Sequence, residues 1–523
     1  MNIARLLDEA ADRAPDATAL FHGAQAHLDY RSLATRAARL CGYLQDRGVA
    51  PGDRVAIFMP NHLAYIEVIY AIFRAGAIAV PVNAMLHERE LAFILQESGL
   101  SLLVTDNQAE GCAGRAVASL HRSVELLNVD TAAYANALRS TAAALVNHEG
   151  NDVAWLFFTS GTTGQPKGAM LTHLNLLLMT SSYLTEVHAV STEDRLLHAA
   201  PMSHGSGMYN FAHIARAGAQ IVPESRGFNA AEILEISARL DHVSLFAAPT
   251  MVHRLLREMP ADDAAPGLDL IVYGGGPMLL GQLQAALSRL GPRFAQIYGQ
   301  GECPMTITRL PRHSHIQNGD EAAHLRRLSS VGTPFHAVDV RIGDASRPFS
   351  IDEAGEILVK SPIVMRGYWR RERLDVSLAQ PQWLKTGDVG YFDADGFLHL
   401  SDRSKDVIIS GGTNIYSREV EDVLIGHHAV EEVAVVGVPN AEWGEEVMAV
   451  IVHGGKDAPT PEDLDAWCAS QMARFKRPRH YLFLRELPKN AYGKIEKNIL
   501  KAMIAETRSR EISGSDNNST WGS

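Results

Sequence analysis

The sequence contains little cysteine, and its four cysteines, Cys41, Cys112, Cys303 and Cys468, form no CxxC pair. This excludes a disulfide framework and a zinc knuckle, and it fits a reducing compartment such as the cytoplasm. Positive charge is also in deficit, because 48 Lys and Arg residues stand against 60 Asp and Glu residues, a formal net charge of −12. A global field that attracts nucleic acid or an acidic membrane is therefore not expected.

The sequence also lacks a long uninterrupted apolar run. Its most apolar stretch, 63–82, contains Glu67 and Arg74, so we expect a helix that leads into a buried strand and no membrane span. The first 15 residues contain three acidic side chains where a secretory leader needs an apolar core, and they predict a short amphipathic helix.

Several catalytic motifs are missing as well. No GxSxG nucleophile elbow and no HExxH zinc motif occurs, although the chain has 22 histidines. No Walker A motif is present, and the triple glycine at 274–276 does not match a GxGxxG fingerprint. We expect His427-His428 and His313-Ser314-His315 to lie on surface elements. The chemistry must therefore come from another kind of site.

What the sequence does contain is an alternation of short β-branched runs with longer helical segments, from residue 53 to about 400. This alternation predicts a largely parallel α/β sheet system, and 523 residues are enough for at least two domains. The expected strands of this part are 54–58, 78–82, 101–105, 153–158, 219–223, 268–273 and 294–298.

The pattern changes near residue 400, where a hairpin signal, Ala394-Asp395-Gly396, precedes the charged segment 402–406. We place a domain boundary there, with an N-terminal domain at 1–401, a hinge at 402–406 and a small α+β domain at 407–508. The small domain should contain strands at 434–438 and 447–452 and helices near 417–425 and 462–472. The polar, Gly/Ser-rich tail 509–523 is expected to be disordered.

One loop has a composition suited to polyphosphate. The strand at 153–158 leads into TSGTTGQPKG (159–168), which contains three glycines, four hydroxyls and Lys167. Glycines let backbone N–H groups converge on an anion, hydroxyls donate further hydrogen bonds, and the lysine adds a mobile charge. A flexible surface loop would have the same composition, so the decision depends on further matching motifs.

Such motifs follow along the chain, and together they resemble the adenylate-forming superfamily, in particular its fatty-acid or aryl-acid CoA ligase branch. The superfamily includes acyl-CoA synthetases, luciferases and the adenylation domains of peptide synthetases. The matching motifs are TSGTTGQPKG (159–168), PMSHG (201–205), GGGP (274–277), YGQGE (298–302), KTGD (385–388), DRSKD (402–406) and PKNAYGK (488–494).

This resemblance implies a large N-terminal domain of stacked α/β sheets plus a β-barrel-like subdomain, and a small mobile C-terminal α+β domain. It also implies that ATP phosphates lie in the first loop, that adenine lies between Tyr298 and a glycine wall, and that Asp388 and Arg403 hold the ribose. The residues that resemble the family's nucleotide site are Thr159, Ser160, Gly161, Thr162, Thr163, Gly164, Lys167, Gly274, Gly275, Gly276, Tyr298, Gly299, Asp388 and Arg403.

Three further roles are implied in the same way. Glu302 resembles the Mg²⁺ ligand, because magnesium usually combines one carboxylate with phosphate oxygens. Lys494 resembles the lysine that reaches the acyl carboxylate and the α-phosphate. Lys405 resembles the hinge about which the small domain rotates, so that Ser410, Gly411 and Gly412 then line the tunnel for the coenzyme A thiol.

The resemblance also implies an acid site, close to the position where the family has a gate residue between its nucleotide and acyl sites. His204 lies where the family separates the nucleotide site from the acyl site, although a packing histidine fits the sequence equally well. Phe246, Met251, Gly301 and Met305 complete a mainly apolar substrate pocket, which suits a fatty, aryl or alicyclic acid.

Gly301 departs from the family pattern, which usually has threonine before the motif glutamate. Losing a hydroxyl that binds phosphate costs about 1.5–3 kcal/mol unless a water or Gln300 replaces it. Our hypothesis is that the glycine serves acid recognition by widening the acyl pocket, so that Gly301→Thr should change which acids are accepted.

The resemblance therefore predicts an AMP-forming acyl-CoA synthetase that uses ATP, Mg²⁺ and coenzyme A. An enzyme that loads a carrier protein is the main alternative, but no Asp stands near His204 to pair with the amino group of an amino acid. A luciferase-like oxygenase would share every nucleotide motif, whereas a nucleotide sensor could have lost Lys167, Glu302 and Lys494. Family members are often dimers, so a homodimer is an expectation by resemblance alone.

Overall fold

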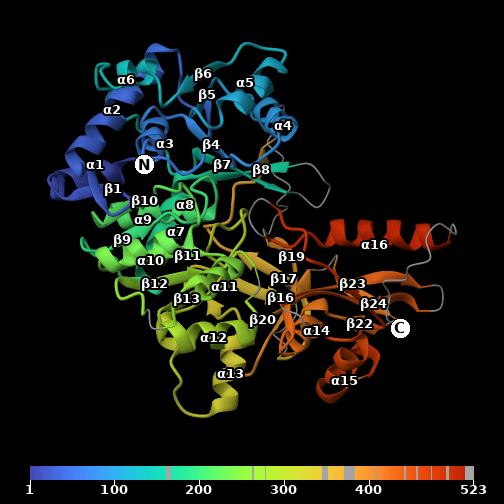
Figure 1. The fold of residues 1–523 in the computed structure, drawn as a ribbon. Helices are drawn as coiled ribbons and strands as arrows, with labels where there is room; N and C mark the ends of the chain where they lie inside the picture. Colours follow the sequence, from blue (N-terminus) through green and yellow to red (C-terminus); the bar gives the residue numbers. More distant parts are fainter. Residues whose placement is uncertain are drawn as a thin grey trace.

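The computed structural model describes residues 1–512, with the exception of 161–165, 262–263, 277, 344–350, 370–382, 404–405, 411–412, 441–442, 455–457, 473 and 491–493. Figure 1 shows two large sheets with their helices in the N-terminal part, and a smaller sheet in the orange and red C-terminal part. No helix within the described residues is long and apolar enough to span a membrane.

The first sheet contains nine strands of the described chain, in the order β15-β14-β13-β12-β11-β9-β10-β1-β2. Its central pairs, from β13 across to β1, are all parallel. The strands are β1 (Thr18–His22), β2 (Gln25–Asp29), β9 (Arg195–Leu197), β10 (Ala219–Val222), β11 (Val243–Ala247), β12 (Leu268–Tyr273), β13 (Phe294–Tyr298), β14 (Thr308–Leu310) and β15 (Thr333–Pro334).

The second sheet has the order β18-β8-β7-β4-β3-β5-β6 among the described residues. Strands β7, β4, β3, β5 and β6 are parallel, and the β7–β8 hairpin adds β8 and then β18 in antiparallel fashion. The strands are β3 (Arg54–Phe58), β4 (Ile78–Val82), β5 (Leu102–Thr105), β6 (Glu125–Asn128), β7 (Val153–Ser160), β8 (Pro166–Thr172) and β18 (Tyr368–Trp369).

Two smaller sheets follow along the chain. One is an antiparallel sheet in the order β16-β17-β19-β20, and the C-terminal sheet has the order β22-β21-β24-β23 with β25 beside β24. The strands are β16 (Asp339–Ile342), β17 (Gly355–Lys360), β19 (Leu384–Phe392), β20 (Leu398–Arg403), β21 (Ile408–Ser410), β22 (Thr413–Ile415), β23 (Val430–Asn440), β24 (Gly444–His453) and β25 (His480–Phe483).

The helices begin and end where local chemistry favours it. Asp29 caps α2 by accepting a hydrogen bond from the Ser32 amide, and α4 starts with a capping box and ends at Gly99 in the left-handed region. The helices are α1 (Arg5–Arg13), α2 (Tyr30–Asp46), α3 (Tyr65–Arg74), α4 (Glu88–Ser98), α5 (Glu110–Ala118), α6 (Ala132–Ala137), α7 (His173–Glu186), α8 (Gly205–Met208), α9 (Asn210–Ala215), α10 (Ala230–Arg239), α11 (Pro249–Glu258), α12 (Leu280–Leu290), α13 (Glu321–Ser329), α14 (Ser417–Leu424), α15 (Pro461–Gln471) and α16 (Lys497–Ile512), with 3₁₀ turns at Arg312–His315 and Arg474–Lys476.

The C-terminal sheet has a core of its own, and it also contacts the N-terminal part. Leu279, which precedes α12, is 8% exposed and packs in the same cluster as Ile408 and Val435. The boundary expected at 402–406 follows the end of β20, and residues 404 and 405 lie outside the described residues. The boundary therefore stays a prediction.

Two expectations about the chain surface need correction. His315 is buried, and its Nε2 lies 3.1 Å from the Tyr273 hydroxyl, because the short turn at Arg312–His315 packs against the end of β12. Residues 509–512 of the expected tail form the end of α16, which continues to Ile512, and residues 513–523 lie outside the described residues.

Four buried histidines should make the fold sensitive to acid. Burial lowers the pKa of His173 to about 3 and the pKa values of His198, His213 and His315 to about 4, from an ordinary value of 6.5. The unfolded chain therefore takes up these protons first, so stability is complete above pH 6.5 and falls as the pH drops toward 4. Each group contributes at most about 3 kcal/mol to the loss at this lower pH.

We expect a lower melting temperature at pH 5 than at pH 7.5, measured by calorimetry. His198→Gln should reduce this pH dependence by removing one of the four buried groups. His121→Gln, which removes an exposed imidazole, should leave the pH dependence unchanged. An equal response of the two variants would contradict the assignment of acid sensitivity to the buried histidines.

Candidate active site

The site lies where the end of β7 meets the loop that follows β13. Thr159, the first residue of the expected phosphate loop, lies near the end of β7. Its hydroxyl is 3.4 Å from the Oε1 of Glu302, which follows β13 by four residues. The first residue of the predicted phosphate loop and the predicted metal ligand, 143 residues apart in the sequence, are therefore neighbours in the fold.

Glu302 is held by a second hydroxyl that the sequence did not point to. Tyr368 in β18 donates a hydrogen bond of 2.7 Å to the same Oε1. Burial and the neighbouring carboxylate raise the pKa of Tyr368 well above its usual range, so its hydroxyl remains a donor. Because β18 pairs with β8, Tyr368 also lies next to Lys167, whose Nζ is 5.4 Å from the ring centroid.

The residues assigned to the nucleoside form a second cluster. Asp388 is buried, and its Oδ2 accepts a hydrogen bond of 2.7 Å from the Tyr298 hydroxyl and one of 2.6 Å from the Gln300 side chain. Gln300 also donates to the carbonyl of Thr386, at 2.9 Å. Arg403 is paired with Asp388 across β19 and β20. The predicted ribose ligands and the predicted adenine neighbour therefore lie together.

The glycine wall follows β12, and one of its members has a steric reason to be glycine. A Cβ atom at Gly274 would lie 2.6 Å from the carbonyl oxygen of Ile297 in β13. This distance is too short for a residue with a side chain. Gly275 has a φ of +77°, a conformation that suits glycine. The chain can therefore pass close to its neighbouring strand and leave a flat backbone surface.

The loop that contains Glu302 doubles back tightly on itself. A Cβ atom at Gly299 would lie 2.7 to 2.8 Å from three backbone atoms of Met305, and Met305 has a φ of +59°, which is unusual for a residue with a side chain. The Met305 sulfur lies against Gly205, since a Cβ atom there would be 2.6 Å away. This contact connects the Glu302 loop with the His204 segment.

His204 precedes α8 and is half-buried. Its ring centroid lies 4.8 Å from that of Phe157 in β7. Burial lowers the pKa of His204 to about 4, so the imidazole is neutral at pH 7 and becomes charged only as the pH falls through about 4. A neutral imidazole can lie beside an apolar acid without placing a charge in the pocket.

Two other expected acid-site residues come from β11 and α11. Phe246, at the end of β11, is half-buried and faces the glycine wall, 3.7 Å from a Cβ atom built at Gly275. Its ring centroid lies 5.9 Å from that of the buried Tyr209. Met251 lies on the first turn of α11 and is partly buried.

Gly301 does not create an opening at its own position. A Cβ atom there would lie 2.6 Å from Cδ1 of Phe157 and 2.6 Å from Cγ2 of Thr159. The space that a threonine side chain would take is thus filled by these two residues of β7. The idea that this glycine widens the acyl pocket needs correction at this point, because the ring of Phe157 occupies the space.

Lys494 lies on the turn before α16, with an exposed side chain. Its amide donates to the side-chain oxygen of Asn490 at 3.1 Å, and the Asn490 amide donates back to the Lys494 carbonyl at 2.8 Å. Lys489 and Lys497 form ion pairs with Glu432 and Glu421. The side chain of Lys494 is exposed on the C-terminal part, between Asn490 and α16.

Some predicted residues cannot be placed. Gly161, Thr162, Thr163, Gly164, Lys405, Gly411 and Gly412 lie outside the described residues. Ser160 and Arg403 are described only as strand residues of β7 and β20, and Ser410 ends β21, where it pairs with Gly444 of β24.

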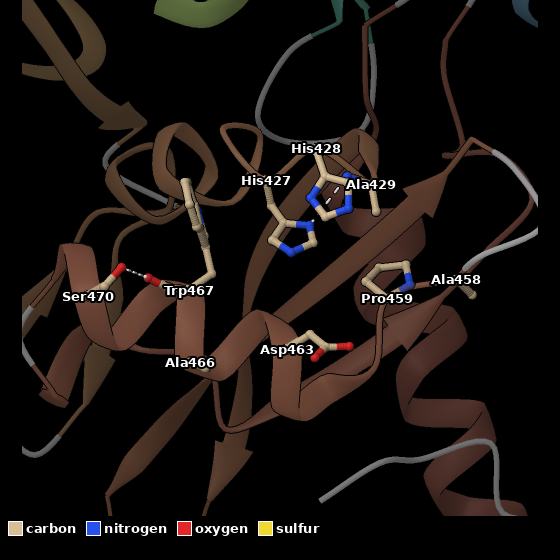
Figure 2. A pocket seen from close by; sticks show the side chains of 9 residues that line it. All are labelled: His427, His428, Ala429, Ala458, Pro459, Asp463, Ala466, Trp467 and Ser470. Atoms are coloured by element: carbon tan, nitrogen blue, oxygen red, sulfur yellow. Dashed lines mark hydrogen bonds between the residues drawn. The ribbon is translucent and has the colours of Figure 1, made fainter.

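A separate hollow of about 490 Å³ lies within the C-terminal part (Figure 2). It is formed by the loop at 427–429 and by α15, so it contains none of the motif residues. His427 is buried and its ring lies 4.5 Å from that of His428 and 5.7 Å from that of Trp467. The expectation that both histidines lie on the surface is correct for His428 alone.

Comparisons with known proteins agree with the geometry. The family model of the AMP-binding enzyme matches residues 7–369, and that of the AMP-binding enzyme C-terminal domain matches residues 419–494. Feruloyl-CoA synthase of an Amycolatopsis species is 37% identical over 494 residues, which cover 93% of this chain and 96% of that protein. The long-chain-fatty-acid–CoA ligase FadD13 of Mycobacterium tuberculosis is 31% identical, with 92% and 94% covered.

The fold is also that of solved structures. The o-succinylbenzoate CoA synthetase MenE of Bacillus subtilis, in complex with its acyl-adenylate intermediate, superposes with a TM-score of 0.82 at 30% identity. The match covers 95% of this chain and 97% of the other. The predicted fold class and the family resemblance are confirmed, and the chain belongs to the AMP-binding enzyme family.

Proposed function

We propose that this chain is an acyl-CoA synthetase that activates an apolar carboxylic acid with ATP and transfers the acyl group to coenzyme A. The contact between Thr159 and Glu302 supports this proposal most directly, because it joins a phosphate-binding loop to a carboxylate that suits a metal ion. The names of the relatives support a thioester product, since they describe feruloyl, long-chain fatty-acid and 2-succinylbenzoate CoA ligases.

In the first step, a carboxylate oxygen of the acid forms a bond to the α-phosphorus of ATP. The bond from that phosphorus to the bridging oxygen breaks, and pyrophosphate leaves with the electron pair. Lys494 offsets the negative charge that builds on the carboxylate and the α-phosphate. The thiol of coenzyme A then loses its proton to solvent and its sulfur forms a bond to the acyl carbon, while the bond from that carbon to the phosphate oxygen breaks and AMP leaves with the electron pair.

The residues around Glu302 fit a magnesium ion. One carboxylate, held in place by the Tyr368 and Thr159 hydroxyls, offers the hard oxygen ligand that magnesium prefers. A bound ion would supply positive charge to the phosphate oxygens. Lys167 provides a further positive charge on the adjacent strand β8.

The predicted acid-site residues support an apolar class of acid. Phe246, Met251 and Met305 are apolar, and His204 is neutral at pH 7, so the site suits an apolar body behind the carboxylate. An aryl or aliphatic chain fits this description. The proposal also includes a cytoplasmic enzyme, since all four cysteines are free thiols, and a homodimer by analogy with the family.

The test measures pyrophosphate release and thioester formation separately, for a panel of aryl, fatty and alicyclic acids, with and without coenzyme A. We expect acid-dependent pyrophosphate release and a thioester product with at least one acid. Pyrophosphate release without any thioester would reject the CoA ligase and favour an enzyme that loads a carrier protein. No acid-dependent release would reject adenylation altogether.

A further inference from the structure

Phe157 connects two residues that the family motifs treat separately, Gly301 and His204. Its side chain is 5% exposed and points from β7 to the same side as Trp155, into the large N-terminal core. One side of its ring fills the space beside Gly301, where a Cβ atom would lie 2.6 Å from Cδ1 and 2.9 Å from Cε1. Its ring centroid is 4.8 Å from that of His204.

The glycine at 301 is required by side-chain contacts and not by its backbone, because a Cβ atom there would lie 2.6 Å from Cδ1 of Phe157 and 2.6 Å from Cγ2 of Thr159. Gly301 is not among the residues with positive φ, a set that includes Gly275 and Met305 nearby. Its backbone would therefore accept a side chain, and only its neighbours exclude one. A contact below 3.0 Å to a ring atom of a buried side chain in the middle of a sheet cannot be relieved by a small rotation.

His204 is confined from two directions. Phe157 packs against its ring, and Gly205 next to it lies against the Met305 sulfur from the Glu302 loop. A change in the volume of residue 157 therefore leaves the imidazole with a different set of rotamers. The adjacent Phe158 lies on the other face of β7, where its ring packs against Gly168.

We propose that Phe157 is a positioning residue for His204, and that the glycine at position 301 leaves the space in which the Phe157 ring lies. The pair thereby sets the wall of the acid site next to the reacting carboxylate. This inference rests on the proposed function in one respect, that His204 borders the acid. In this proposal Phe157 and Gly301 act together on the acid site, whereas the hypothesis from the sequence gave acid recognition to Gly301 alone.

The test is a double-mutant cycle read from adenylation alone, as acid-dependent exchange of pyrophosphate into ATP. Gly301→Thr should lower kcat about tenfold or more, because the threonine meets the Phe157 ring. In the Phe157→Ala background, the same substitution should cost at least about threefold less, because the ring and its Cδ1 atom are removed and only Cγ2 of Thr159 remains against residue 301. Equal losses in both backgrounds would overturn the steric coupling.

A second cycle tests whether Phe157 acts through His204. Phe157→Leu should lower kcat and alter the KM for the acid, with the KM for ATP within about twofold of the original. In the His204→Ala background it should have little further effect, and a full additional loss there would overturn the positioning role. Phe294→Leu, which changes a buried phenylalanine at the start of β13, is the control and should leave kcat and both KM values unchanged.

Two further measurements separate the steric coupling from loss of fold and from failure of the proposed function. A melting temperature for each variant identifies loss of fold, which would lower adenylation without any rescue in the double variant. The thioester assay on the original protein tests the proposed function independently, because the cycles need adenylation only. If the protein adenylates an acid but forms no thioester, the proposal of a CoA ligase is rejected. The cycles would still test the coupling of Phe157 and Gly301, because they measure adenylation.

Discussion

Replacing Lys494 with alanine should lower acid-dependent pyrophosphate release by about 100-fold or more, the largest loss expected for any single side chain of the C-terminal part. The reason is charge: two anionic groups, the acid and the α-phosphate, must approach each other, and an exposed lysine on a turn can be brought to them by movement of the C-terminal part. Thioester formation from supplied acyl-adenylate and coenzyme A should fall by less than about threefold, because that step uses a different arrangement of the two parts.

Lys501→Ala is the matched control, since it removes a lysine from α16 seven residues further along the chain. It should change neither half-reaction by more than about twofold. Lys489 and Lys497 are less suitable controls, because each forms an ion pair within the C-terminal part. An equal loss of both half-reactions in Lys494→Ala would contradict a role confined to adenylation.

The buried parallel strands were predictable because of their environment. Strands β3, β4, β12 and β13 coincide with the predicted ranges 54–58, 78–82, 268–273 and 294–298. In β4 every residue is buried, and a strand covered on both faces must be an unbroken apolar run. The helix and strand predicted within 63–82 are likewise found as α3 and β4.

The antiparallel sheet of β16, β17, β19 and β20 was not predicted strand by strand. Strand β19 alternates between buried and less buried residues along its whole length, and such a pattern gives a weaker signal than a continuous apolar run. Only its hairpin was visible, as Ala394-Asp395-Gly396 between β19 and β20, where Gly396 has a φ of +80°. Turn chemistry identified a connection whose strands the composition did not reveal.

The residues of the candidate site were likewise predicted only in part from the sequence. Thr159, Glu302 and Asp388 were identified from motif order. Tyr368, which contacts Glu302, and Phe157, which contacts Gly301 and His204, were not identified. Tyr368 follows Glu302 by 66 residues and reaches it only because β18 joins the edge of β8. Phe157 is apparent once β7 is known to alternate, since Phe157 and Phe158 must face opposite sides, but no sequence pattern shows which side meets Gly301.

The second large effect is expected at Glu302. Glu302→Gln keeps the size of the side chain but removes the negative charge, and we expect adenylation to fall by about 100-fold or more at saturating ATP. The hydrogen bonds from Tyr368 and Thr159 converge on Oε1, and the glutamine oxygen can accept them in one amide orientation. The loss should therefore come from the metal site and not from a misplaced loop.

Titration with magnesium separates these two causes. If Glu302 is the metal ligand, the concentration of Mg²⁺ that gives half-maximal adenylation should rise at least about tenfold in Glu302→Gln, with a melting temperature close to that of the original protein. Glu321→Gln, which removes an exposed carboxylate from the first turn of α13, is the control and should leave the magnesium dependence unchanged. An unchanged magnesium dependence in Glu302→Gln, with adenylation still lost, would instead assign Glu302 a structural role in holding Tyr368 and Thr159 together.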